Sequence, residues 1–450
     1  MKMRVASRRL MQHVFARSVS SIAPASRLNG VMSSVFSVYT QLANQHKAIN
    51  LGQGFPDCSP PSFLLEEAAA VLTSPTPAYH QYAPSEGAPP LVSAICSLSS
   101  LSPTPDCVTV TNGATEALFS TFQALLNHGD EVVVMEPFYD SYIAQVQMAG
   151  GKPVCVPLRV DAKGGEVTAA SQFKLDVDEL RRAVSDKTRL IVLNSPHNPT
   201  GKVFTTEELE QIAQVAIEKD LIVVSDEVYE WLAFADRADT AKGEKGASTK
   251  PASIAAIAGM KDRTVTIGSA GKTFEATGWK VGWAIASPQL SKYIAAAHKW
   301  VPFSVATPLQ VAVGNALLHA RDNGYFAELS SRYQRKRDLL DEGLERAGLT
   351  PMKPDGGFFI LADTSLFPSS IVDEEKELAR REESGSELQR DEAIARWMTK
   401  KGVCVIPPSA FYRKEHKHLA ENWVRVCFAK SDDTLTQAGE KLEEITRPFR

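Results

Sequence analysis

A regular alternation of strand-like and helix-like segments between residues 107 and 286 most strongly limits the fold of this chain. Short runs rich in Val, Ile and Thr are separated by stretches with the apolar spacing of amphipathic helices. This alternation predicts βαβ crossovers and an α/β fold with a mainly parallel sheet flanked by helices. Seven strands are expected, at 107–111, 131–135, 153–157, 189–193, 221–224, 264–268 and 281–286.

The sequence changes character after about residue 310. Long charged helical patterns follow, for example at 325–347, and then strand signals at 357–361 and 423–428. These patterns predict a smaller α+β domain, because the 450 residues exceed the usual size of one compact domain. Residues 369–391 are dense in Glu, Asp and Arg and indicate a solvated helix or a flexible insert. The expected order is an N-terminal arm packing on the small domain, a large domain and the small C-terminal domain, at 29–50, 51–310 and 311–450.

The first 28 residues contain six basic and five serine residues, whereas the first acidic residue is Asp57. An Arg-rich, Ser-rich start without acidic residues is typical of an organelle transit peptide. The mitochondrial matrix is the expected location, with a plastid or the cytoplasm as alternatives. A disordered basic tail without targeting function is the other interpretation of this segment.

Composition excludes several classes of protein. The formal charge of -4 argues against a nucleic-acid partner, and no apolar run is long enough to span a membrane. The six cysteines form no C-x-x-C pair, which argues against a zinc site or a disulfide framework. We therefore expect no metal centre, no membrane association and a reducing compartment.

One loop, 269–282, places Lys272 among small residues directly after an expected strand. A lysine amine can form a Schiff base with an aldehyde cofactor, and the small neighbours leave space around it. A second cation, Lys280, follows eight residues later and could contact a phosphate. Two solvated surface lysines are the simpler alternative for this loop alone.

Other polar residues follow neighbouring strands, and ligands of open α/β sheets bind at those strand ends. Thr115 opens a helix after Asn-Gly-Ala, where free N–H groups could hold a phosphate. Tyr139 could stack on a planar ring, and Asn198 lies in the rigid loop Ser-Pro-His-Asn-Pro-Thr-Gly. Asp226 needs a cationic partner such as a pyridinium N–H. Tyr229 would lie on the same face as Asp226 if a helix began there.

Arg425 lies in the middle of the expected strand at 423–428, among apolar residues. A buried arginine needs an anion, and its planar fork matches a carboxylate. A structural ion pair with Asp or Glu is the alternative.

Taken together, these motifs resemble those of fold-type I pyridoxal-phosphate enzymes, the class I aminotransferases. The motifs are N-P-T-G, S-D-E-V-Y and S-x-G-K-x-F-x-x-T-G-W-K-x-G, in order over residues 29–450. Three more, I-N-L-G-Q-G-F-P-D, E-P-F-Y-D-S-Y and G-G-F-F, resemble the branch of kynurenine aminotransferases and glutamine transaminase K.

The resemblance implies a role for each candidate residue. Lys272 would bind pyridoxal 5'-phosphate covalently, Asp226 would pair with its ring nitrogen, and Lys272, Asp226 and Tyr229 would form the catalytic set. The implied cofactor contacts are Ala114, Thr115, Tyr139, Asn198, Tyr229, Ser269 and Lys280. The implied contacts of the substrate carboxylate are Gly54, Asn198 and Arg425. Tyr82 would reach the cofactor phosphate of a neighbouring subunit, which implies a homodimer with shared sites.

The implied reaction moves an amino group from an L-amino acid to a 2-oxo acid, with kynurenine, glutamine, methionine or an aromatic amino acid as donor. Lys272 would serve as general base and acid. One alternative is a cysteine-S-conjugate β-lyase on the same cofactor, and another is a non-catalytic module that only binds the cofactor. A nicotinamide dehydrogenase is disfavoured because no G-x-G-x-x-G follows the first strand.

Overall fold

The computed structural model describes residues 25–29, 34–161, 167–237, 250–382 and 387–450. The chain separates into two compact units, Met1–Ser33 and Ser34–Arg450. In the first unit, residues 25–29 are described, and Ser26–Leu28 form a short 3-10 turn. Most of the predicted targeting segment, 1–28, therefore lies outside the described residues.

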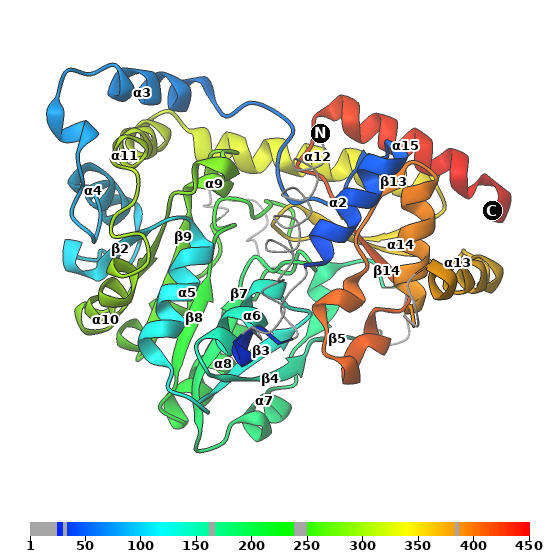
Figure 1. Cartoon of the computed structure of the whole chain (residues 1–450), viewed down its shortest axis with the longest axis horizontal. Coiled ribbons are helices and arrows are strands. Elements are labelled where there is room, and N and C mark those ends of the chain that lie inside the picture. Colours follow the sequence, from blue (N-terminus) through cyan, green and yellow to red (C-terminus); the bar gives the residue numbers. More distant parts are fainter. Residues whose placement is uncertain (1–24, 30–33, 162–166, 238–249, 383–386) are drawn as a thin grey trace, which may run out of the picture. The chain divides into compact units, whose positions relative to one another are not determined.

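A seven-stranded sheet forms the centre of the second unit (Figure 1), in the order β2-β10-β9-β8-β7-β3-β4. β10 runs antiparallel to both of its neighbours, whereas the other neighbouring pairs are parallel. The strands are β2 Val108–Thr111, β3 Glu131–Glu136, β4 Lys152–Pro157, β7 Thr188–Asn194, β8 Ile222–Asp226, β9 Thr264–Ser269 and β10 Gly282–Ile285. The prediction of a mainly parallel seven-stranded sheet is confirmed.

Alternate side chains of each strand enter two hydrophobic cores, one on each face of the sheet. In β3, Val132 and Val134 join one core, and Val133 and Met135 join the other. This is the expected result of the two-residue repeat of a strand that is buried on both faces. The helices that follow these strands cover the faces, namely α5 Ala114–Leu125, α6 Asp140–Met148, α7 Val177–Ala183, α8 Thr206–Glu218 and α10 Pro288–Lys299.

Three further helices belong to the second unit: α3 Ser62–Leu72, α4 Pro89–Leu98 and α11 Thr307–Asp322. α11 packs against both α3 and α4 (Figure 1). The predicted domain boundary at 310–311 falls inside this helix. A short hairpin of β5 Arg159–Val160 and β6 Phe173–Lys174, and the one-turn helix α9 Ala270–Thr273, complete this part.

A three-stranded antiparallel sheet, β11-β12-β14, forms the centre of the C-terminal part. Its strands are β11 Thr350–Met352, β12 Phe359–Asp363 and β14 Trp423–Cys427, and its helices are α12 Tyr325–Arg346, α13 Ser369–Glu382, α14 Arg390–Lys400 and α15 Asp432–Thr446. α15 runs alongside α12 (Figure 1). In the charged segment, α13 buries Ile371, Val372 and Ala379, so an amphipathic helix replaces the expected solvated one.

The arm that precedes the large domain contains α2 Val35–His46 and β1 Ile49–Asn50. Ser34 caps α2 by accepting a hydrogen bond from the N–H of Phe36. α2 contacts α14, and β1 pairs in parallel with β13 Val403–Cys404. The arm is thereby attached to the C-terminal part of the chain.

Candidate active site

Five strands of the large sheet end around one cavity. β2, β3, β7, β8 and β9 end in or are followed by segments that carry most of the candidate residues, whereas Gly54 follows β1 and Arg425 lies in β14. Nine of those residues line the cavity: Gly54, Ala114, Thr115, Tyr139, Asn198, Asp226, Tyr229, Lys272 and Arg425. The strand-end argument therefore located the site, because parallel strands deliver their following loops to one edge of the sheet.

Lys272 lies on the one-turn helix α9, directly after β9, and its amine faces the cavity. Nζ donates a hydrogen bond to the carbonyl oxygen of Gly54 at 3.1 Å. It also lies 4.9 Å from the ring centre of Phe358. Burial lowers the pKa of Lys272 to about 8, although Asp226 acts in the opposite direction. The amine is therefore partly unprotonated near neutral pH, as a nucleophile requires.

Asp226 ends β8 and is buried, with two donors to its carboxylate. Tyr142 Oη donates to Oδ2 at 2.6 Å, and the N–H of Val228 donates to Oδ1 at 3.4 Å. Burial raises the pKa of Asp226, and the Tyr142 hydrogen bond works against this rise. Asn194 Nδ2 and the N–H of Ser195 hold the backbone oxygen of Asp226, which fixes the strand end.

Tyr229 lies in a turn, so the helix on which it would share a face with Asp226 does not form. The turn closes with hydrogen bonds from the N–H of Glu230 to Glu227 and from the N–H of Leu232 to Tyr229. The side chain of Tyr229 still lines the cavity, with its ring centre 5.7 Å from Lys272 Nζ. Tyr229 and Lys272 lie close together because the turn places Tyr229 over the ends of β8 and β9.

The first turn of α5 forms a second polar region of the site. Its N-cap, Gly113, has no side chain to bond the free N–H groups of Ala114 and Thr115, and its φ is 77°. Lys280 lies beside it, because a Cβ added at Gly113 would lie 3.1 Å from Nζ. Ser269 ends β9 next to the Lys272 helix. Free N–H groups beside an ammonium favour an anion here.

Arg425 is fully buried in β14 and lies against three aromatic rings. Its guanidinium carbon is 4.0 Å from the ring centre of Phe359, with Phe36 and Phe411 at 5.1 and 5.2 Å. Nη1 donates to Asn198 Oδ1 at 3.1 Å and Nη2 to the carbonyl oxygen of Gly52 at 2.7 Å. Burial lowers the pKa of Arg425 to about 10, so the side chain stays charged at neutral pH.

Within the described residues, Arg425 forms no ion pair with a carboxylate, and its buried Nε has no hydrogen-bond partner. The alternative of a structural ion pair is therefore not found in the described part of the chain. A buried cation held by two neutral oxygens remains available to an anion from outside the chain.

A short segment, residues 51–58, covers one side of the cavity and is fixed to the C-terminal part. Lys430 Nζ donates to the carbonyl oxygen of Phe55 at 2.7 Å, and Asp57 accepts from Ser431 and Thr434. This segment brings Gly54 to Lys272 and Gly52 to Arg425, so both parts of the chain contribute to one site.

Three candidates lie outside this cavity lining: Tyr82, Ser269 and Lys280. Tyr82 is on the surface with 82% of its area exposed, and its ring packs edge-on against Phe303. Ser269 and Lys280 lie near the start of α5, as described above.

Several residues of the cavity were missed by sequence reasoning. Phe36 comes from the arm, Tyr142 from α6 and Phe359 from β12. Phe359 follows the Gly-Gly pair of a quoted motif, which was a usable signal. Tyr142 is likewise the last residue of the quoted motif E-P-F-Y-D-S-Y, although the helical pattern around it does not separate it from an ordinary core residue.

The described residues offer neither a metal centre nor a membrane span. They contain no group of three or more His, Cys, Asp or Glu side chains that could hold a metal ion. They also contain no helix long and apolar enough to cross a membrane.

A lysine, a carboxylate and an arginine thus line one cavity at the strand ends of an α/β sheet. The model of the family "Aminotransferase class I and II" matches residues 46–442, and the chain belongs to this family. It is therefore an aminotransferase.

Named relatives agree over nearly the whole chain. The kynurenine--oxoglutarate transaminase of Dictyostelium discoideum is 40% identical, over 98% of this chain and 99% of that protein. The structure of Bna3p from Saccharomyces cerevisiae matches with a TM-score of 0.83 and 33% identity, over 95% and 99% of the two chains. The methionine aminotransferase YbdL from Escherichia coli matches with a TM-score of 0.79 and 32% identity, over 94% and 100%.

Proposed function

We propose that this aminotransferase uses pyridoxal 5'-phosphate to move the amino group of kynurenine, glutamine, methionine or an aromatic L-amino acid to a 2-oxo acid. The observation that carries the proposal is the buried Arg425, which lacks an ion-pair partner in the described residues and lines the same cavity as Lys272. The guanidinium of Arg425 can bind the α-carboxylate of a substrate, and the amine of Lys272 can form a covalent bond with an aldehyde.

The residues present fit the cofactor. Lys272 offers a buried amine of lowered pKa for the aldehyde, and Asp226 offers a buried carboxylate for the ring N–H. The N–H groups of Ala114 and Thr115, with Ser269 and Lys280, suit the phosphate. Tyr139 and Tyr229 supply aromatic and hydroxyl contacts to the ring. The cofactor, when bound, supplies an electron sink for the substrate α-carbon.

Several side chains around the cavity have their own proposed roles in binding the substrate or moving a proton. Arg425 and Asn198 hold the substrate carboxylate, since Asn198 Oδ1 already accepts from Arg425 and its Nδ2 is left to donate. Lys272 Nζ takes the proton from the substrate α-carbon and returns it at the next step as general acid. Asp226 holds a proton on its ring partner, with Tyr142 keeping the carboxylate in place.

The proposed substrate class has two supports. The relative from Dictyostelium is named for kynurenine and oxoglutarate, and YbdL for methionine. The cavity also carries aromatic rings, Phe36, Phe55 and Phe359, where the side chain of a donor would lie. These rings favour apolar and aromatic side chains over charged ones.

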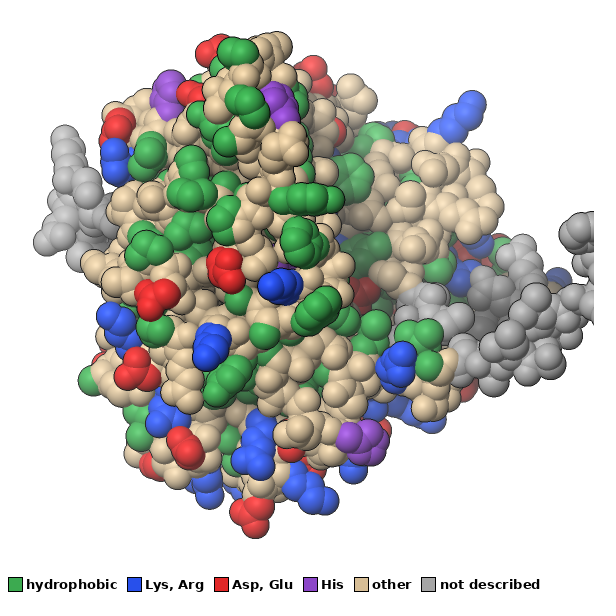
Figure 2. Space-filling view, turned by 60° about the vertical axis from the view of Figure 1, so that its left-hand side comes forward, with side chains coloured by type: hydrophobic (Ala, Val, Ile, Leu, Met, Phe, Trp, Pro, Cys, Tyr) green, Lys and Arg blue, Asp and Glu red, His purple; other side chains and the backbone are tan. Residues whose placement is uncertain are grey.

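A homodimer with shared sites is the proposed assembly. Tyr82 and Phe303 pack together on the surface, and Trp300 is 85% exposed nearby in sequence. Figure 2 shows hydrophobic side chains over the face that comes forward from the left of Figure 1, where α3, α4, α10 and α11 lie. Exposed aromatic clusters of this kind are typical of interfaces. In such a dimer Tyr82 would reach the phosphate of the partner's cofactor.

Residues 1–28 are proposed to direct the protein to the mitochondrial matrix, on the basis of their composition alone. A fluorescent protein fused to residues 1–28 tests this directly. Fluorescence in mitochondria supports the proposal, whereas fluorescence in plastids or the cytosol contradicts it without affecting the enzyme assignment.

The test of the catalytic proposal is a panel of amino donors and 2-oxo acceptors with the purified full-length protein and added cofactor. Formation of the matching 2-oxo acid from kynurenine, glutamine, methionine or phenylalanine is the expected result. Pyruvate release from a cysteine S-conjugate, measured in the same panel, detects β-lyase activity. Absence of transamination with all four donors, in protein that binds the cofactor, would overturn the substrate proposal.

A further inference from the structure

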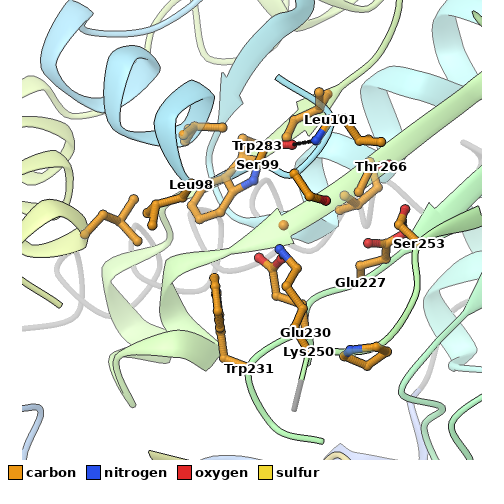
Figure 3. Close-up of a pocket in the computed structure, with 17 residues that line it drawn as sticks. Leu98, Ser99, Leu101, Glu227, Glu230, Trp231, Lys250, Ser253, Thr266 and Trp283 are labelled. Carbon is orange, nitrogen blue, oxygen red and sulfur yellow. Dashed lines mark hydrogen bonds and ion pairs between the residues drawn. The ribbon is translucent and has the colours of Figure 1, made fainter. Parts of the chain in front are cut away.

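A second cavity, of about 210 Å³, lies on the other side of the strand ends and shares no lining residue with the Lys272 cavity. Its floor is one face of β9 and β10, where Thr266, Gly268, Trp283 and Ile285 line it. The end of α4 and Leu317 of α11 provide apolar walls. Figure 3 shows its labelled residues converging on one space.

The floor of the cavity depends on one glycine. Gly268 and Trp283 are cross-strand partners, and a Cβ added at Gly268 would lie 2.1 Å from Trp283 Nε1. Glycine at this position therefore lets the indole lie across β9. Trp283 is 5% exposed, and its N–H donates no hydrogen bond to any other described residue. The indole nitrogen faces the cavity (Figure 3), so this donor is available to a ligand.

An ion pair forms the opposite side. Glu230 and Lys250 are paired, and both side chains are mostly buried, with 17% and 21% of their area exposed. Lys250 Nζ also lies 4.6 Å from the ring centre of Trp231. The charged ends of Glu230 and Lys250 extend together into the cavity toward Trp283 (Figure 3).

A second carboxyl group, Glu227, limits the charge that the cavity accepts. Its Oε1 accepts hydrogen bonds from Ser225 at 2.8 Å and Ser253 at 2.6 Å. Burial raises the pKa of Glu227 to about 7, so its negative charge is disfavoured. The ammonium of Lys250 is already paired with Glu230, and an anionic ligand would further disfavour ionisation of Glu227, so a ligand without net charge is favoured.

We propose that this cavity binds a small apolar α-amino acid as its zwitterion. The ligand ammonium pairs with Glu230, and its carboxylate accepts from Lys250 and from the Trp283 N–H. Its side chain lies against Ile95, Leu98 and Leu317. The ligand stays neutral overall, extends an existing ion pair and places apolar area on apolar walls.

The cavity is well placed to influence the reaction. Glu227 directly follows Asp226, and Gly268 directly precedes Ser269, so both cavities are built on the same strand ends. The binding site itself does not depend on the proposed substrate or cofactor, and its test uses binding and not turnover.

The probe is 1-aminocyclopentane-1-carboxylic acid, an apolar amino acid with no α-hydrogen, so it cannot be transaminated. Crystals of the full-length protein soaked with this probe are expected to show it between Lys250 and Trp283. In solution, calorimetric titration of the wild type is expected to contain a binding component that Lys250→Met weakens by about tenfold or more, since a charge-assisted contact is lost.

Two variants complete the design. Leu98→Trp fills the cavity from its apolar wall and should remove the same component, while Lys219→Met, an exposed lysine on another surface, should leave it unchanged. Thermal unfolding of each variant establishes that it is folded. An empty cavity in the soaked crystals, or equal binding by wild type, Lys250→Met and Leu98→Trp, overturns the proposal.

Discussion

The phenol of Tyr142 donates a hydrogen bond of 2.6 Å to Oδ2 of Asp226, and both residues are buried. Tyr142 lies on α6 and Asp226 at the end of β8, 84 residues apart. The contact holds the carboxylate against one wall of the cavity and opposes the rise in the pKa of Asp226 that burial causes. We therefore expect Tyr142 to act on the reaction through Asp226, as a positioning residue.

Replacement of Tyr142 by Phe should reduce kcat more than it changes KM. The lost hydrogen bond is charge-assisted and worth roughly 1.5–3 kcal/mol, so kcat should fall by about 10- to 150-fold. The pKa of Asp226 should rise, because one stabilising donor is removed. A pH profile of the visible spectrum of bound cofactor measures that shift. A profile identical to wild type would show that Tyr142 only fills space.

Asp226→Asn should impair turnover far more than folding. Burial raises the pKa of Asp226, so the native cofactor-free protein gains little stability from this charge. The free energy of unfolding should therefore change by about 1 kcal/mol or less. Turnover needs the anionic partner of the ring nitrogen and should fall severely. Denaturant unfolding measures the stability of the variant, and steady-state kinetics on the same preparation measure its turnover. Near-normal turnover would contradict the role proposed for Asp226.

Lys272→Ala should abolish turnover while leaving a folded protein that still binds the cofactor without a covalent bond. The amine has no structural ion pair in the described residues, and its hydrogen bond goes to the backbone of Gly54. Borohydride reduction of the wild type, followed by peptide mapping, identifies the attached lysine. Label on Lys280 or any other lysine would refute the role given to Lys272.

The rate at which the cofactor-free protein captures pyridoxal 5'-phosphate should rise with pH and level off above about pH 8. The free amine is the nucleophile, and burial lowers the pKa of Lys272 to about 8 from an ordinary 10.5. Between these values the unfolded chain holds a proton that the native chain has released. This group therefore makes the free energy of unfolding increase with pH across that window. Stopped-flow absorbance over this range gives the midpoint, and a midpoint near 10 would mean that the amine is not desolvated.

The central sheet was predictable because each of its strands is a run of apolar, largely β-branched residues between polar turns. The predicted strand ends differ from the observed ones by about two residues at most. Because ligands bind at the ends of parallel strands, the prediction placed Asn198, Asp226 and Lys272 in one region. Arg425 was recognisable because a cation in the middle of an apolar strand has few structural reasons to be there.

Other features depend on contacts that no local pattern encodes. Tyr142 ends the quoted motif E-P-F-Y-D-S-Y, but its contact with Asp226 forms only when α6 is packed on the end of β8. Tyr229 would share a face with Asp226 only if a helix began there, but the chain turns instead and the N–H of Glu227 donates to Ile267 of β9. Phe36 reaches the site because the arm is fixed to the C-terminal part.

Arg425→Ala should weaken binding of every amino acid and 2-oxo acid substrate without releasing the cofactor. The guanidinium is fully buried against Phe359 and is held by Asn198 and Gly52 through neutral oxygens. Its pKa, lowered to about 10 by burial, still leaves it charged at neutral pH. Loss of a desolvated carboxylate contact should cost about 2–5 kcal/mol in kcat/KM.

Two further variants separate the carboxylate role from a structural one. Arg425→Lys keeps a cation but not the planar fork, so it should restore only part of the affinity. Arg335→Ala removes an exposed arginine on α12 and should behave as wild type. The decisive measurements are the visible spectrum of the resting protein and kcat/KM for several donors. A normal spectrum with a uniform loss of kcat/KM supports the carboxylate role, because the proposal places Arg425 at the substrate and not at the cofactor. Unchanged kcat/KM, or loss of the cofactor spectrum, would mean that Arg425 stabilises the fold and that the carboxylate binds elsewhere.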